Sequence, residues 1–172
     1  MKTTTKKLSF SALLSALALI TFMIESLFPP LIIPGARMGL SNVFILLCII
    51  FLGGKYAFIV LLVKVTLGSL FSGNISALMY SLPSGVIALV VQVVLLQFNS
   101  GLSIIAVSIL GSVINSITQN VIFCLVMHSS AYLAYSPYLA LSGVISGAIV
   151  GVTVFFLTKK LNSTKLAKQL IS

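Results

Sequence analysis

Long apolar runs alternate along the chain with short connections rich in polar and helix-breaking residues. About 20 apolar residues in a helix match the roughly 30 Å of a bilayer's hydrocarbon core, so each run is a candidate membrane crossing. Six runs are present: Leu8–Phe28, Gly39–Leu52, Tyr56–Phe71, Ser76–Gln97, Leu102–His128 and Tyr138–Thr158. They do not alternate in polarity as the strands of a membrane β-barrel do. The pattern predicts one all-α integral membrane domain, residues 1–172, with six transmembrane helices.

Two of these runs depart from a regular apolar helix. Gly39–Leu52 is short for a crossing unless the stretch before it also enters the membrane. Pro83 interrupts the fourth run within YSLPSG, and because proline removes a helix hydrogen bond, either a broken helix or a simple kink is expected there. The connection PPLIIPGARMGLSNV, residues 29–43, contains three prolines, two glycines and Arg37, the one arginine of the chain.

Composition and charge support a membrane protein and suggest its orientation. Only 6% of the residues are charged, against about 25% in soluble domains. Basic residues favour the cytoplasmic side, so a cytoplasmic N-terminus and C-terminus are expected, with residues 161–172 as a cytoplasmic tail. Eight of the ten basic residues then face the cytoplasm: Lys2, Lys6, Lys7, Lys55, Lys159, Lys160, Lys165 and Lys168. The net charge of +9 is therefore assigned to topology and anionic lipid rather than to nucleic acid.

Three ionisable residues are the first candidates for function. Lys64 lies nine residues after Lys55, about 14 Å deep at about 1.5 Å per residue, and a charge at that depth is costly. It contacts either a ligand or, in a purely structural role, carbonyls and amides of other helices. Glu25 and Arg37 are expected at similar heights near the outer surface. They form an ion pair that holds the connection, or Glu25 contacts a ligand directly.

Polar residues within the runs supply further candidates. Ser108, Ser112, Asn115 and Gln119 share one helical stripe, because their spacing is four, three and four residues. Such a stripe either joins helices, the better interpretation for the serines, or lines a cavity, which the two large amides favour. Tyr80, Asn42 and Asn74 are weaker candidates for the same substrate site.

The sequence offers no catalytic or metal-binding constellation. Glu25 is the one acidic residue, so the chain lacks the paired carboxylates and aspartate clusters that prenyl-transfer chemistry uses to hold magnesium. Cys48 and Cys124 lie in apolar runs, and His128 has no second histidine beside it. We therefore expect no enzyme activity, no cofactor and no bound metal.

Small residues recur at helical spacing in the first and last runs. Gly143, Gly147 and Gly151 form a ladder that permits close approach of a second helix, and Ala12 and Ala16 form a similar pair. Packing within the chain is the simpler explanation for both.

The sequences PGARMGLSN, LGSLFSG and YSLPSG, with the basic residue Lys64 between the first two, resemble the Gx transporter family, whose members are labelled heptaprenyl diphosphate synthase component I. The resemblance covers about residues 8–161. This family in turn resembles the S components of energy-coupling factor (ECF) transporters, which are six-helix, substrate-binding membrane proteins.

The resemblance implies a function and a set of partners. An S component takes up a vitamin or precursor together with a transmembrane coupling subunit and two ATPase subunits, in the bacterial cytoplasmic membrane. Ala12 and Ala16 would dock on the coupling subunit, and Arg37 would belong to a cap over an external substrate site. Arg37 and Lys64 suggest an anionic or phosphate-bearing small molecule, such as a flavin- or isoprenoid-related compound. The alternative is a noncatalytic accessory subunit of a polyprenyl diphosphate synthase.

Overall fold

The computed structural model describes residues 2–27, 39–73, 75–98 and 101–162, and this part of the chain is a helical bundle without strands. Its elements are α1 (Lys2–Leu27), α2 (Asn42–Leu52), α3 (Gly54–Phe71), α4 (Ser76–Phe98), α5 (Ile104–Val126), the 3-10 helix η1 (Ser130–Tyr135) and α6 (Ser136–Asn162). All the α-helices except α2 are long and apolar enough to cross a membrane. The predicted all-α membrane fold is confirmed.

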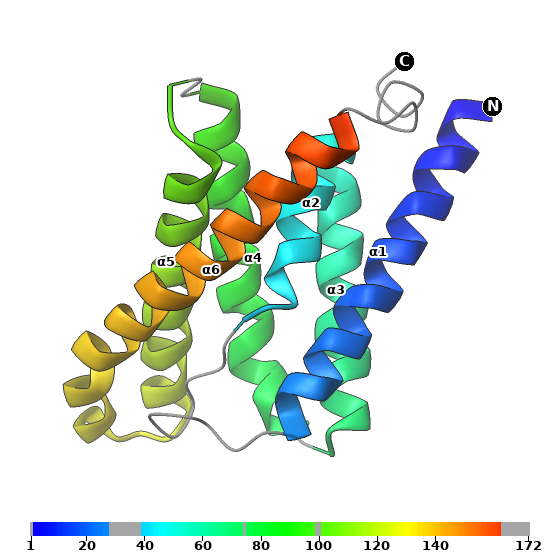
Figure 1. Cartoon of the computed structure of the whole chain (residues 1–172). Helices are drawn as coiled ribbons and strands as arrows, with labels where there is room; N and C mark the ends of the chain where they lie inside the picture. The colour runs from blue at the N-terminus through cyan, green and yellow to red at the C-terminus, as the bar shows by residue number, and fades with distance from the viewer. Residues whose placement is uncertain (1, 28–38, 74, 99–100, 163–172) are drawn as a thin grey trace.

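The start of α1 and the end of α6 lie at the same end of the bundle (Figure 1). We call this the terminal end and the opposite one the distal end. The terminal end also holds the start of α3 with Lys55, so the lysines at the two ends of the described chain and Lys55 gather there. This arrangement is the one that the charge pattern predicts for the cytoplasmic side.

The short helix α2 occupies the centre of the bundle and does not cross it alone. Its 11 residues extend about 16 Å, roughly half of the hydrocarbon thickness. In Figure 1, α2 begins near mid-height of the bundle and ends at the terminal end. The helix expected over residues 39–52 begins only at Asn42, because Gly39–Ser41 form a turn in which Asn42 N–H donates to the Gly39 carbonyl (2.9 Å). Gly39 has φ of 66°, a left-handed conformation that glycine adopts readily.

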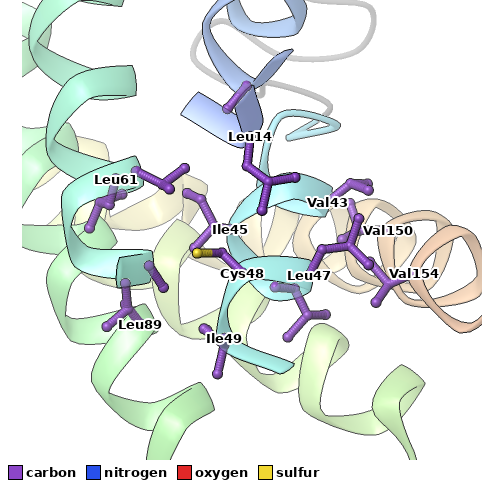
Figure 2. Packing of buried hydrophobic residues seen from close by; sticks show 14 of the residues in the cluster. Leu14, Val43, Ile45, Leu47, Cys48, Ile49, Leu61, Leu89, Val150 and Val154 are labelled. Carbon is purple, nitrogen blue, oxygen red and sulfur yellow. The ribbon is translucent and has the colours of Figure 1, made fainter. Parts of the chain in front are cut away.

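The core of the protein forms around α2. Seven of its residues are buried, on all sides of the helix: Val43, Ile45, Leu46, Leu47, Cys48, Ile49 and Phe51. Figure 2 shows α2 side chains surrounded by Leu14 of α1, Leu61 of α3, Leu89 of α4 and Val150 of α6. A helix that is apolar all round belongs inside a protein. The position of α2 follows from that composition, and its polar N-terminal end is thereby placed inside the bundle.

Other element boundaries differ from the expected ones. Helix α1 begins at Lys2 rather than at residue 8, while α5 covers 104–126 rather than 102–128. Helix α6 extends from 136 to 162, beyond the expected 138–158, and η1 forms where only a connection was expected. Of the expected cytoplasmic tail, residues 161–172, the first two residues belong to α6 and residues 163–172 lie outside the described residues. Since hydropathy marks where a helix is buried in lipid rather than where its hydrogen bonds end, such shifts at helix ends are natural.

Helix α4 continues through Pro83 without a break. Of the two alternatives for YSLPSG, the broken helix is therefore wrong. In the same turn, the Ser84 hydroxyl donates to the Ser81 carbonyl (3.1 Å).

The glycine ladder of α6 packs directly on the backbone of α5. A Cβ atom placed on Gly147 would lie 2.6 Å from Ile109 Cα, and one on Gly151 would lie 2.8 Å from Ile105 Cα. Both distances are shorter than a carbon–carbon contact allows, so only glycine permits this approach. The ladder therefore serves packing within the chain.

We expect Gly147→Ala to lower the stability of the folded protein, because α6 must move away from the α5 backbone. Overpacking of this kind costs about 1–3 kcal/mol. Thermal unfolding in detergent measures the effect. Val144→Ile, which adds one carbon on an exposed part of the same helix, is the control and should leave the unfolding temperature unchanged. An equal temperature for Gly147→Ala and wild type would contradict the close packing.

Candidate functional site

Lys64 of α3 lies buried inside the bundle, with only 6% of its surface exposed. Its Nζ atom donates a hydrogen bond to Asn42 Oδ1 on the first residue of α2 (2.6 Å). The same Nζ lies 5.9 Å from the centre of the Phe22 ring of α1, within the range of a cation–π interaction. Phe22 itself packs against Gly68, where a Cβ would lie 2.5 Å from the ring. Lys64 thus joins α1, α2 and α3 near the middle of the bundle.

Glu25 of α1 contacts the turn that precedes α2. One carboxylate oxygen accepts a hydrogen bond from the backbone N–H of Leu40, and the other accepts one from the Ser41 hydroxyl (3.3 Å). Glu25 also interacts electrostatically with Lys64. The carboxylate, Ser41, Asn42 and Lys64 therefore form one polar cluster at the entrance of α2 to the bundle.

A small cavity continues from this cluster towards α4 and α5. Its volume is about 20 Å³, which is room for one water molecule. Four polar side chains line it: Asn42, Gln92, Ser112 and Asn115. The remaining lining is apolar or glycine: Ile45, Leu61, Gly85, Ala88, Leu89 and Gly111. Amides from three helices, a hydroxyl and the nearby lysine give this region both hydrogen-bond donors and acceptors.

Gln92 is a cavity residue that the sequence analysis missed. It is 8% exposed and lies on α4, opposite Gly111 of α5. A Cβ on Gly111 would lie 2.2 Å from Gln92 Nε2, so the carboxamide rests in the space that the glycine leaves. The available signal was a lone glutamine within an apolar run, since polar groups inside a membrane need partners.

The four polar residues of the α5 stripe have different surroundings. Ser108 and Ser112 pack against the α6 glycines, and Ser112 also borders the cavity with Asn115. Gln119 donates to the Ser81 hydroxyl of α4 (3.3 Å) and does not line the cavity. The stripe thus contacts α6 at Ser108 and Ser112 and lines the cavity at Ser112 and Asn115.

Three further residues predicted for the substrate site, Tyr80, Arg37 and Asn74, are not found in the cavity lining of the described residues. Tyr80 makes an edge-to-face contact with Phe123 (5.5 Å between ring centres), and Phe123 makes another with Tyr132. This aromatic cluster lies towards the distal end and is not part of the cavity lining. Arg37 and Asn74 lie outside the described residues, so the expected pair between Glu25 and Arg37 remains a prediction.

Ala12 and Ala16 lie on the exposed side of α1. Leu14, Ala18 and Phe22 of the same helix are buried. The alanine pair is therefore not needed for packing among the described helices, in contrast to the α6 glycines. An exposed pair of small residues leaves room for a helix of another protein to approach closely.

The described residues contain no group of three or more histidine, cysteine or acidic side chains that could hold a metal ion. Cys48 and Cys124 are both buried and unpaired with each other. His128, just after α5, is exposed and has φ of 51°.

Comparison with known proteins places the chain in a family. The family model described as heptaprenyl diphosphate synthase component I matches residues 14–157. Searches of curated proteins and of solved structures gave no match. The matched range begins within α1 and ends within α6, so it includes the whole polar cluster and the cavity. The protein is therefore a membrane protein that belongs to the heptaprenyl diphosphate synthase component I family.

Proposed function

We propose that the protein is the substrate-binding S component of an ECF-type uptake transporter for a small molecule with an anionic or phosphate-bearing group. The observation that carries this proposal is the buried Lys64 beside a polar cavity at the centre of a membrane bundle. A lysine at this depth costs several kcal/mol unless its surroundings compensate, and such residues usually mark a substrate path. Purely structural contacts between helices do not need a charge.

The balance of charges favours an anionic ligand. Glu25 is the one acidic residue of the chain, whereas Lys64 and Arg37 are two basic residues expected in the same half of the protein. If Arg37 lies beside Glu25 and Lys64 as expected, the site carries a positive excess that a negatively charged substrate would complete. Asn42, Gln92 and Asn115 would supply uncharged hydrogen bonds that fix the orientation of the ligand.

Binding requires the cavity to enlarge. Pockets for vitamin-sized molecules have volumes of about 300–1,000 Å³, far above the space present here. The Gln92 carboxamide fills the gap over Gly111, and the Glu25 carboxylate holds the turn at Leu40 and Ser41. Movement of these two side chains would open the region between α2, α4 and the distal end of α1.

Ala12 and Ala16 suggest how the protein would assemble into a transporter. Their exposed pair on α1 fits the docking of a transmembrane coupling subunit, which in turn would bind two ATPase subunits. Neither the sequence nor the site supplies the residues for ATP hydrolysis or prenyl transfer. In this proposal the protein binds substrate in a bacterial cytoplasmic membrane and catalyses no reaction.

The family description favours a second candidate, a noncatalytic membrane subunit of a polyprenyl diphosphate synthase. In that role the protein would hold the soluble synthase at the membrane or receive its lipid product. The buried lysine would then contact a diphosphate group. Both candidates predict an anionic ligand, but they differ in the partner.

Co-purification distinguishes the two candidates. We expect the protein, extracted from its own membrane in a mild detergent, to retain a coupling subunit and ATPase subunits together with a small anionic compound. Mass spectrometry of the partners and of the released compound gives both identities. Recovery of a prenyl-transferase subunit without ATPases would instead support the accessory role. Empty vector membranes and a Gly147→Leu variant, in which the fold is disturbed, serve as controls.

A further inference from the structure

The Glu25 carboxylate accepts hydrogen bonds from the same kinds of donor that an anionic ligand would need. Its two carboxylate oxygens accept from a backbone N–H and from a hydroxyl, and Lys64 lies near enough to attract it electrostatically. These are a bidentate oxyanion contact and a buried cation, the usual components of a carboxylate or phosphoryl site. The protein thus already binds one oxyanion at this position, and that oxyanion is its own side chain.

We infer that Glu25 is an intramolecular occupant of the anion-binding position, and that the oxyanion of a ligand displaces it to reach the Leu40 N–H, the Ser41 hydroxyl and Lys64. The inference deepens the proposed function and rests on it for the existence of a ligand. It assigns the ligand class, a carboxylate or phosphoryl oxyanion, and identifies the group that competes with it.

The position of Glu25 on α1 makes displacement possible without movement of the helix. Glu25 lies two residues before Leu27, the last residue of α1, and the neighbouring Ser26 and Leu27 are exposed. A change of rotamer would carry the carboxylate from the cluster towards the distal surface, where water can solvate it.

The cluster also connects the anion position to the cavity. Asn42 accepts from Lys64 with its side-chain oxygen and lines the cavity with Gln92, Ser112 and Asn115. An oxyanion at the Glu25 position would therefore leave the rest of a ligand free to extend past Asn42 into the bundle. With Glu25 displaced, the turn of residues 39–41 loses its contact with α1, and the entrance beside α2 can widen.

Displacement predicts that Glu25 weakens anion binding, which is the opposite of a ligand-contacting role. We expect Glu25→Gln to bind inorganic pyrophosphate at least tenfold more tightly than the wild-type protein. Glutamine has the same shape, and its one carbonyl oxygen can still accept from the Leu40 N–H, but it has no charge to compete for Lys64. Isothermal titration of the purified protein in detergent with pyrophosphate measures the two affinities.

Three further variants and a second probe make the test decisive. Ser26→Ala changes an exposed neighbour that bonds only to Met23 within α1 among the described residues, and should bind as the wild type does. Glu25→Gln combined with Lys64→Met should lose the gain. Acetate in place of pyrophosphate separates a carboxylate site from a phosphoryl site. Glu25→Ala provides a second neutral side chain in case the glutamine variant elutes as an aggregate.

Several outcomes would overturn the inference: equal or weaker binding by Glu25→Gln, no binding of either probe by either protein, or failure of both neutral variants to fold, which would make Glu25 structural. None of these bears on co-purification of the wild-type protein, which tests the proposed function separately. Conversely, tighter binding by Glu25→Gln without any ATPase partner would support the anion site and remove the transporter assignment.

Discussion

If the protein is the proposed S component, replacement of both Ala12 and Ala16 by tryptophan is expected to abolish assembly with a coupling subunit while leaving the fold and ligand binding intact. Both alanines are exposed on α1, so the added rings extend away from the buried side of the helix, which Leu14 and Ala18 occupy. Close approach of two membrane helices depends on small residues, because packing and backbone contacts replace the hydrophobic driving force there. Two indole rings separated by one turn would hold a partner helix several ångströms away.

The measurement is the amount of coupling subunit and ATPase subunits that co-purifies with each variant from the native membrane. Ile145 and Ile149 of α6 have the same spacing and are 57% and 50% exposed, so Ile145→Trp with Ile149→Trp is a matched control. That control should assemble normally. The thermal unfolding temperature of both double variants should remain near the wild-type value. Undiminished assembly of the alanine variant would remove the docking role from α1.

The contrast between the alanine pair and the glycine ladder could not be predicted from the sequence. Both patterns have the same spacing, and from spacing alone packing within the chain was the simpler explanation for each; the family resemblance was what assigned Ala12 and Ala16 to docking. In the structure the glycines meet the α5 backbone, whereas Ala12 and Ala16 meet none of the described helices closely enough to be buried. Which side of a helix faces its neighbours depends on the arrangement of the whole bundle, and in a membrane both sides are apolar.

The helices themselves were predictable because the apolar runs are long and the bilayer fixes their length. The role of α2 was harder to predict. Its short length is visible in the sequence, but its central position depends on the five long helices around it. That position places Asn42 beside Lys64, 22 residues away in sequence. Sequence reasoning identified both residues separately and had no means to join them.

The partners of Glu25 illustrate a different limit. The pair with Arg37 that charge suggested stays a prediction, and the described contacts of the carboxylate are a backbone N–H, a serine hydroxyl and an electrostatic interaction with Lys64. Every residue except proline carries a backbone N–H, so composition does not reveal which one will be free to donate. Gln92 was missed for a similar reason. Its side chain occupies a space on α5 that exists only because residue 111 is a glycine, and the sequence does not show that the two residues meet.

Lys64→Met is expected to weaken binding of the co-purified anionic compound at least tenfold, a loss of about 1.4 kcal/mol. Methionine is unbranched and apolar, so it preserves the packing of the lysine stem while removing the ammonium group. Only 6% of the surface of Lys64 is exposed. A charge interaction shielded from water to this degree is stronger than one at a protein surface. Loss of the positive charge should therefore affect an anionic ligand more than any single amide substitution in the cavity.

The same substitution also disturbs the protein without ligand, and the experiment must separate the two effects. Lys64→Met leaves the Glu25 carboxylate without the field of Lys64 and removes the donor to Asn42 Oδ1, so the unfolding temperature should fall. Glu25→Gln in the Lys64→Met background removes the uncompensated charge and should restore part of that stability without restoring affinity. Lys64→Arg, which keeps the charge, should retain most of the binding. If Lys64→Met and wild type bind the compound equally well, Lys64 serves only to hold α1, α2 and α3 together, and the positive charge at the centre of the bundle has no part in recognition.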